Sequence, residues 1–239
     1  FSLMKKLRLI LSGEQDAGFN MAVDEALSYS VRKGWTGSTL RIYQWKQPAV
    51  SLGCHQTSKI LERFSKNQLG KAVVVQRPTA GGAVLHGKDV SYALVLDQST
   101  LKGRSSQSLY AKFHGALAKA LPDSYDLSTR GGRSVPSSAV CFQAPVINDL
   151  MREDLKIAGA AQRRWRNCLL QQGTVQEPSL SRDRIALFIR SAWMRVLGCE
   201  FEVRNLTADE HVLADELWSK YRPWKHSSLP RVSQSAFSR

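Results

Sequence analysis

The sequence lacks any long apolar run. No stretch of about 18 consecutive apolar residues occurs in the chain, so we expect no membrane-spanning helix. The apolar stretch near the N-terminus is short, and no small-x-small cleavage pattern follows it, which argues against a secretory signal peptide. We therefore expect a cytoplasmic protein with no membrane partner.

Cysteine is also scarce. The chain has no CxxC pair and no Cys/His cluster at the spacing of metal ligands, and its four thiols lie far apart at Cys54, Cys141, Cys168 and Cys199. This pattern argues against a disulfide framework and against a zinc site, and we expect no metal. Cys168 and Cys199 lie beside leucines, so we expect both to be buried as small hydrophobic residues.

Acidic residues are few relative to basic ones. The 239 residues include 34 Lys and Arg but only 20 Asp and Glu, which gives a net charge of +14. Such a balance predicts an acidic partner: a nucleic acid, an anionic surface or an acidic protein. The densest basic group, Arg163-Arg164-Trp165-Arg166, could stack on bases or simply end a solvated strand. Charge alone does not choose between these partners.

Apolar periodicity predicts an α+β (α/β) fold, with one mixed β-sheet flanked by helices. The predicted helices cover 19–31, 59–67, 106–121, 182–197 and 208–221, and the predicted strands 7–11, 39–45, 49–53, 71–76, 90–96, 139–143, 155–163 and 169–175. We expect the strands at 39–45 and 49–53 to pair with each other. Residues 124–138 are rich in Ser, Gly and Arg and predict a loop or an irregular edge. With no repeat and no linker, we expect a single domain over 1–239.

Cys141 and Lys156 are a candidate catalytic pair. Lys156 follows Cys141 by fifteen positions. A thiol reacts as its thiolate, and a nearby ammonium group favours that anion. The pair therefore suggests an acyl-carrying nucleophile with an electrostatic activator, although spacing alone would also fit two unrelated residues.

Two further segments could surround such a site. The segment 77–86, RPTAGGAVLH, joins two apolar strands, and Gly81 and Gly82 allow a sharp bend or a close approach to a ligand. Its backbone amides could hold a carboxylate, a carbonyl oxygen or a phosphate, with Arg77 adding charge; a plain hairpin turn is the alternative. In the segment 156–162, KIAGAAQ, small side chains after Lys156 leave room for a ligand or for another backbone.

Five segments, in this order, resemble motifs of the biotin/lipoate A/B protein ligase family. They are NMAVDEAL at 20–27, RPTAGGAVLH at 77–86, VSYA at 90–93, KIAGAAQR at 156–163 and LLQQGT at 169–174, and the resemblance extends over residues 7–196. It implies the biotin/lipoate protein ligase catalytic-core fold, without a C-terminal accessory domain. It also implies a substrate-binding role for Arg77, Thr79, Ala80, Gly81, Gly82, Ala83, His86, Ala158, Gly159 and Ala160.

The resemblance separates two chemistries. Lipoate–protein ligases activate a free acid as an acyl-adenylate and would need ATP and Mg. Cysteine-dependent octanoyltransferases and amidotransferases instead carry a thioester and require no cofactor, and the segment VCFQAP around Cys141 is similar to theirs. Ala80, Gly82 and Ala160 depart from the family pattern. We expect these departures to affect the choice of substrate more than the class of reaction.

The resemblance favours octanoyl or lipoyl transfer, with Cys141 and Lys156 as the catalytic residues. The implied acyl donor is an octanoyl-carrier protein, and the implied acceptors are the lipoyl domains of 2-oxoacid dehydrogenases or the glycine cleavage H protein. His86 could carry a proton or could only fix the loop. An ATP-dependent ligase remains an alternative, as does a non-catalytic binder of nucleic acid or protein, although the motifs argue against nucleic acid.

Overall fold

The computed structural model describes residues 4–122, 124–129, 142 and 145–225. The predicted strand at 139–143 lies outside these residues apart from Phe142. Most of the predicted loop at 124–138 also lies outside them, although its described part contains the short strand β7 (Asp126–Leu127).

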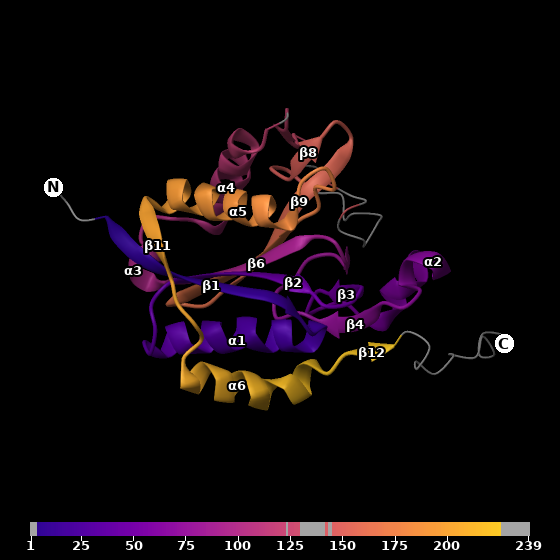
Figure 1. The fold of residues 1–239 in the computed structure, drawn as a ribbon, viewed down its shortest axis with the longest axis horizontal. Helices are drawn as coiled ribbons and strands as arrows, with labels where there is room; N and C mark the ends of the chain where they lie inside the picture. Colours follow the sequence, from indigo (N-terminus) through magenta and orange to yellow (C-terminus); the bar gives the residue numbers. More distant parts are fainter. Residues whose placement is uncertain (1–3, 123, 130–141, 143–144, 226–239) are drawn as a thin grey trace, which may run out of the picture.

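An eight-stranded mixed sheet forms the centre of the fold (Figure 1). Its order is β11 (Cys199–Val203), β1 (Lys5–Gln15), β2 (Thr39–Trp45), β6 (Val90–Asp97), β10 (Cys168–Val175), β9 (Leu155–Arg164), β8 (Leu150–Arg152) and β7. Strand β1 runs parallel to β2 and β11, whereas all other neighbours pair antiparallel. The mixed sheet flanked by helices that the sequence predicted is confirmed.

A second sheet corrects the prediction of one sheet. It has the order β12 (Trp224–Lys225), β4 (Val73–Gln76), β3 (Ala49–Leu52) and β5 (Val84–His86). The predicted pairing of strands 39–45 and 49–53 was therefore wrong, because β2 pairs with β1 and β6 while β3 pairs with β4 and β5. Pro48 precedes β3, and since proline has no N–H to donate to a ladder, it interrupts the strand at this point.

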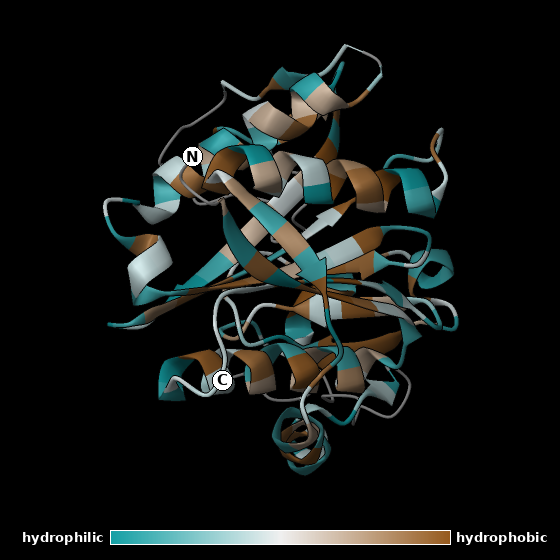
Figure 2. Cartoon of the chain, turned by 60° about the vertical axis from the view of Figure 1, so that its left-hand side comes forward, coloured by the Kyte–Doolittle hydropathy of each residue, from teal (hydrophilic) through white to brown (hydrophobic). Residues whose placement is uncertain are grey.

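Helices cover both faces of the large sheet (Figure 1). On one face lie α4 (Ser106–Ala120) and α5 (Arg182–Leu197), and on the other lie α1 (Ala17–Lys33) and α6 (Ala208–Trp218), which continues as the 3-10 helix η3 (Ser219–Tyr221). Two apolar clusters fill these interfaces, and Figure 2 shows the apolar strands between the two helical layers. Of the helices in the described ranges, none is both long and apolar enough to span a membrane.

The remaining helices are short. The 3-10 helix η1 (Ser58–Arg63) and α2 (Lys66–Leu69) pack against the small sheet in a third apolar cluster, and α3 (Gln98–Leu101) follows β6. The long helices are delimited by local chemistry: the Asp16 side chain accepts hydrogen bonds from the first turn of α1, and Gly34 ends it at φ 73°. Ser181 and Gly198 have the same roles in α5, whose observed bounds equal the predicted ones.

Candidate active site

A β-bulge places the Lys156 side chain on the face of β9 that lies away from the apolar cluster beneath α4 and α5. In the β8–β9 hairpin, Met151 pairs with Lys156 and Leu150 with Ala158, so Ile157 is an extra residue in β9. As a result, the consecutive residues Ile157 and Ala158 both join the core beneath α4 and α5. The Lys156 side chain lies over Gly159, where a Cβ would come within 2.5 Å of its Cε and 2.7 Å of its Nζ. The glycine thus provides the space that the ammonium group occupies.

Asp149 holds the Lys156 ammonium group. Its Oδ2 lies 2.7 Å from Lys156 Nζ, and both side chains are almost completely buried. The Val146 N–H donates to the same carboxylate at 2.7 Å, and the Tyr110 hydroxyl also donates to it. A buried ammonium group needs such a counter-charge. Sequence reasoning missed Asp149, although a hairpin turn after 152 would have placed it beside the strand that carries Lys156.

His114, on α4, is a buried histidine in the same region. Its ring lies 4.4 Å from the Tyr110 ring, and its side chain is fully buried. Burial and the nearby Lys156 ammonium group lower the pKa of His114 to about 3. His114 is therefore neutral at physiological pH and adds no second positive charge beside Lys156.

This buried histidine should make the fold weaker in mild acid. Since its folded pKa of about 3 lies below the ordinary value, the unfolded chain binds a proton at pH 5 that the folded chain does not, so acid favours unfolding. Between pH 7.5 and pH 5 we expect the wild type to lose about 2 kcal/mol more free energy of unfolding than His114→Phe. Urea denaturation at both pH values measures this difference, and equal losses in the two proteins would contradict it.

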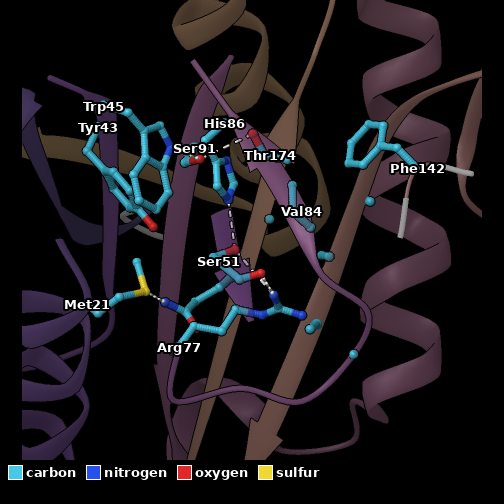
Figure 3. Close-up of a pocket in the computed structure, with 16 residues that line it drawn as sticks. Met21, Tyr43, Trp45, Ser51, Arg77, Val84, His86, Ser91, Phe142 and Thr174 are labelled. Carbon is cyan, nitrogen blue, oxygen red and sulfur yellow. Dashed lines mark hydrogen bonds between the residues drawn. The ribbon is translucent and has the colours of Figure 1, made fainter. Parts of the chain in front are cut away.

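A pocket adjoins Gly159, between the two sheets. Its enclosed cavity is small, about 60 Å³, and it opens to solvent at its mouth. Figure 3 shows Phe142 on one side and Tyr43 and Trp45 on the other. The accessible lining is mostly apolar, and it consists of Met21, Tyr43, Trp45, Ser51, Arg77, Gly81, Val84, His86, Ser91, Phe142, Gly159, Ala160, Ala161, Gln172, Gly173 and Thr174.

Arg77 holds the loop between β4 and β5 in shape. Its Nη2 donates to the Ala80 and Gly82 carbonyls at 2.6 and 2.9 Å, its Nη1 to Ser51, and its Nε to the Thr79 hydroxyl. All three guanidinium nitrogens are thus bound within the protein, and Arg77 acts on a ligand through the loop it shapes. Gly81 adopts φ 92°, a left-handed conformation that favours glycine.

Ser51, His86 and Asp89 form a relay, a chain of hydrogen bonds that leads from the pocket lining into the protein. Ser51 Oγ lies 2.8 Å from His86 Nε2, and His86 Nδ1 lies 2.8 Å from Asp89 Oδ2. Burial acts to raise the pKa of Asp89, but His86 and hydrogen bonds from Thr174 and the Gly87 amide lower it overall. The ionised carboxylate can only accept, so Nδ1 carries the proton. The Trp45 ring stacks on His86 at 4.0 Å and fixes its plane.

A second polar network ties the loop to helix α1. The Asp24 carboxylate pairs with Arg41 at 2.7 Å, and both side chains are fully buried. Gln172 donates to Asp24 at 2.7 Å and accepts from the Thr79 hydroxyl at 2.8 Å. Burial raises the pKa of Asp24 despite the opposing effect of Arg41. The NMAVDEAL segment is therefore connected to the site by hydrogen bonds from Asp24 through Gln172 to Thr79. The spacing of residues in the sequence did not reveal this connection.

The structure brings most of the predicted site residues together. Five of them line the pocket: Arg77, Gly81, His86, Gly159 and Ala160. Thr79 and Ala83 are buried behind it, and the Ala80 and Gly82 carbonyls accept from Arg77. Ala158 does not line the pocket, because the bulge turns it into the core beneath α4 and α5. Cys141 lies outside the described residues, but its chain neighbour Phe142 lines the pocket with its ring centroid 5.2 Å from Lys156 Nζ.

The three described cysteines differ in accessibility. Cys168 and Cys199 are buried, as predicted, and burial raises the pKa of Cys168 to about 12 and of Cys199 to about 11. Neither can supply a thiolate at neutral pH. Cys54 is half-exposed, in the turn after β3. No group of three or more His, Cys, Asp or Glu side chains suited to a metal ion occurs in the ranges that the structure describes.

Comparison with known proteins gives concordant matches. The family model of the lipoyl protein ligase A/B catalytic domain matches residues 16–178. An octanoyltransferase LipM from Kyrpidia tusciae is 29% identical over 91% of this chain and 97% of its own length. Another, from Halalkalibacterium halodurans, is 34% identical over 72% of this chain, and the match spans 66% of that protein.

Solved structures agree on the fold, which is confirmed as that of the lipoate–protein ligase catalytic core. A putative lipoate protein ligase from T. acidophilum with bound lipoic acid superposes with a TM-score of 0.73 at 22% identity, covering 90% of this chain and 95% of that one. A lipoate-protein ligase A bound with ATP also gives 0.73, at 21% identity, covering 94% of this chain and 97% of that one. Since the family model matches more than half of the chain, this protein belongs to the lipoyl protein ligase A/B catalytic domain family.

Proposed function

We propose that this protein is an octanoyltransferase of protein lipoylation that carries the acyl group as a thioester on Cys141. The observation that carries the proposal is the position of Phe142, which is bonded to Cys141 in the chain, lines the pocket and lies 5.2 Å from the Lys156 ammonium group. The similarity to octanoyltransferases over 91% of the chain supports the same chemistry. Among the described cysteines, Cys168 and Cys199 are too deeply buried to compete.

In the first half-reaction, the Cys141 thiolate attacks the carbonyl carbon of an octanoyl thioester on a carrier protein. A new C–S bond forms to Cys141, the bond to the carrier's thiol breaks, and the released thiolate takes up a proton. The Lys156 ammonium group, fixed by Asp149, would favour the thiolate and the negative charge that develops on the carbonyl oxygen. In this role Lys156 needs no cofactor.

The Gly81 amide is a candidate second donor to that oxygen. Because the Ala80 carbonyl points at Arg77, the Gly81 N–H of the same planar peptide points away from Arg77. Gly81 lines the pocket, and within the described ranges its N–H has no hydrogen-bond acceptor. The apolar lining beyond it suits an eight-carbon chain, since each buried CH₂ contributes about 0.8 kcal/mol.

In the second half-reaction, a lysine amine of a lipoyl domain attacks the octanoyl-enzyme. An amide bond forms, the C–S bond to Cys141 breaks, and the amine proton must leave. His86, with Ser51 on its Nε2, is the base in the pocket lining best placed to accept a proton, directly or through the Ser51 hydroxyl. Lipoyl domains of 2-oxoacid dehydrogenases or the glycine cleavage H protein would be the acceptors. The reaction would take place in the cytoplasm.

Mass spectrometry of the intact protein tests the proposal. After incubation with octanoyl-carrier protein, we expect one octanoyl adduct, which peptide mapping places on Cys141. The adduct should be absent from Cys141→Ser and present in Cys54→Ser, the control for a half-exposed thiol. A wild-type protein that stays unmodified with a competent donor would refute the mechanism.

An ATP-dependent ligase is the second candidate, because the ATP-bound lipoate-protein ligase A shares this fold. In that case Lys156 would contact phosphate and acyl oxygens. Lipoate-dependent exchange of pyrophosphate into ATP that survives Cys141→Ser would establish it in place of the thioester route.

A further inference from the structure

A basic and aromatic patch lies where the end of α1 meets the turn between β9 and β10. It consists of Arg32, Lys33, Trp35, Arg163, Trp165 and Arg166, and we refer to it as the α1–β9 patch. Its four cations are exposed, and Trp35 is 55% exposed. Trp and Arg are the residue types most enriched at the energetic centres of protein interfaces, whereas a merely solvated face carries few exposed tryptophans.

The charge of the patch is not neutralised locally. Some cations elsewhere in the described chain are paired with carboxylates, as in Arg8–Glu210, Arg152–Glu177 and Lys220–Glu25. Among the ion pairs found there, none involves Arg32, Lys33, Arg163 or Arg166. The Glu25 carboxylate, on the same helix α1, is already bound by Lys220 at 2.6 Å. The patch therefore presents positive charge outward.

The patch is also held in shape before any partner arrives. The Arg32 and Arg163 guanidinium groups each lie 4.9 Å from the centroid of the Trp165 ring. The Asn167 side chain donates to the Arg32 carbonyl at 2.9 Å and thereby joins the β9–β10 turn to the end of α1. Just after the end of α1, Trp35 packs edge-on against Tyr29 of the helix, with the ring centroids 5.4 Å apart. A prearranged surface loses less conformational entropy on binding than a set of free side chains.

One face of β9 connects the patch to the active site. Beyond the bulge, alternate residues Gly159, Ala161, Arg163 and Trp165 share a face, and the first two line the pocket. At about 3.3 Å per residue, Arg163 lies roughly 7 Å along the strand from Ala161. Arg163 also donates to the Pro78 carbonyl at 3.3 Å, so it contacts the loop that Arg77 shapes.

We infer that the α1–β9 patch docks the protein that delivers the acyl group, an acidic carrier domain whose thioester hangs on a phosphate-linked arm. This inference rests on the proposed function. The arm carries a phosphodiester that guanidinium groups bind well. The acceptor instead presents a lysine ammonium group, which four unpaired cations repel. A nucleic acid fits less well, because two guanidinium groups already lie over the Trp165 ring on which a base would stack.

Charge reversal at Lys33 and Arg166 tests the inference. In Lys33→Glu/Arg166→Glu we expect the KM for octanoyl-carrier protein to rise by about fivefold or more at low salt, with kcat unchanged. The KM for the lipoyl domain and the rate with a small uncharged octanoyl thioester should not change. The matched control is Lys119→Glu/Arg195→Glu, which removes the same charge from exposed positions in the last turns of α4 and α5, on the other face of the sheet.

Three outcomes would overturn the inference. An unchanged KM for the carrier would show that the patch does not dock it, and a raised KM for the lipoyl domain alone would assign the patch to the acceptor. Salt-dependent binding of single-stranded DNA that the reversal abolishes, with kinetics unaffected, would assign it to nucleic acid. Binding of the carrier can also be measured by fluorescence anisotropy, without turnover, so that docking and catalysis are tested separately. If the patch binds the carrier but the protein forms no Cys141 adduct, only the thioester mechanism is refuted.

Discussion

Replacing Lys156 with methionine is expected to slow acyl-enzyme formation by about a hundredfold or more and to lower the free energy of unfolding by about 3–5 kcal/mol. Methionine matches the length of the lysine chain but carries no charge. The Asp149 carboxylate, fully buried, would then lose the ammonium group 2.7 Å away and keep only neutral donors. Single-turnover acylation and urea denaturation measure the two effects.

A second variant separates stability from chemistry at this pair. In Lys156→Met/Asp149→Asn the buried charge is removed together with its partner, and the asparagine can still accept from the Val146 N–H. We expect most of the lost stability to return, because breaking a buried pair costs more than removing both of its charges. Acylation should stay slow, since the Lys156 ammonium group beside Gly159 is gone. Recovery of the acylation rate in the double variant would show that Lys156 has only a structural role.

Local patterns in the sequence were sufficient to predict most of the elements. The helix at 182–197 was predicted with its observed bounds, and the structure shows a Ser181 cap before it and Gly198 after it. Strand β11 was missed although Cys199 and Phe201 are buried between exposed glutamates, a period-two signal that is short and follows directly on a helix. The division into two sheets was also missed, since strand partners are chosen by contacts between distant segments.

The site was predicted in its outline from motifs but not in its internal contacts. The loop at 77–86 and the strand from Lys156 were identified, and the structure places them around one pocket. The Asp149 partner and the Ser51–His86–Asp89 relay were not identified, because each joins segments whose spacing carries no chemical signature. Lys156 lies on the opposite face of β9 from Ala158 because of a single extra residue in the strand. The alternation of apolar and polar residues in the sequence does not reveal such a bulge.

Gly53→Ala is expected to reduce acylation by about a hundredfold, since a displacement of roughly 1 Å near reacting groups has that effect. Gly53 follows β3, and a Cβ there would lie 2.2 Å from the Gly81 carbonyl oxygen and 3.0 Å from the Ala80 carbonyl carbon. Both are backbone atoms, so no side-chain rotation relieves the clash. The 77–82 loop must move, and with it the Gly81 amide proposed to face the acyl oxygen. We expect the free energy of unfolding to fall by only about 1–3 kcal/mol.

Gly87→Ala is the matched control, because a Cβ at Gly87 has no atom within 4 Å and the residue lies beside the same relay. It should acylate like the wild type. If Gly53→Ala is acylated at the wild-type rate, the 77–82 loop does not position the reacting carbonyl group. Slow acylation with nearly native stability would instead mean that the Gly53–Gly81 contact holds the loop in its reactive shape. Arg77 would then set the direction of the loop carbonyls, and Gly53 would set how closely the loop approaches the pocket.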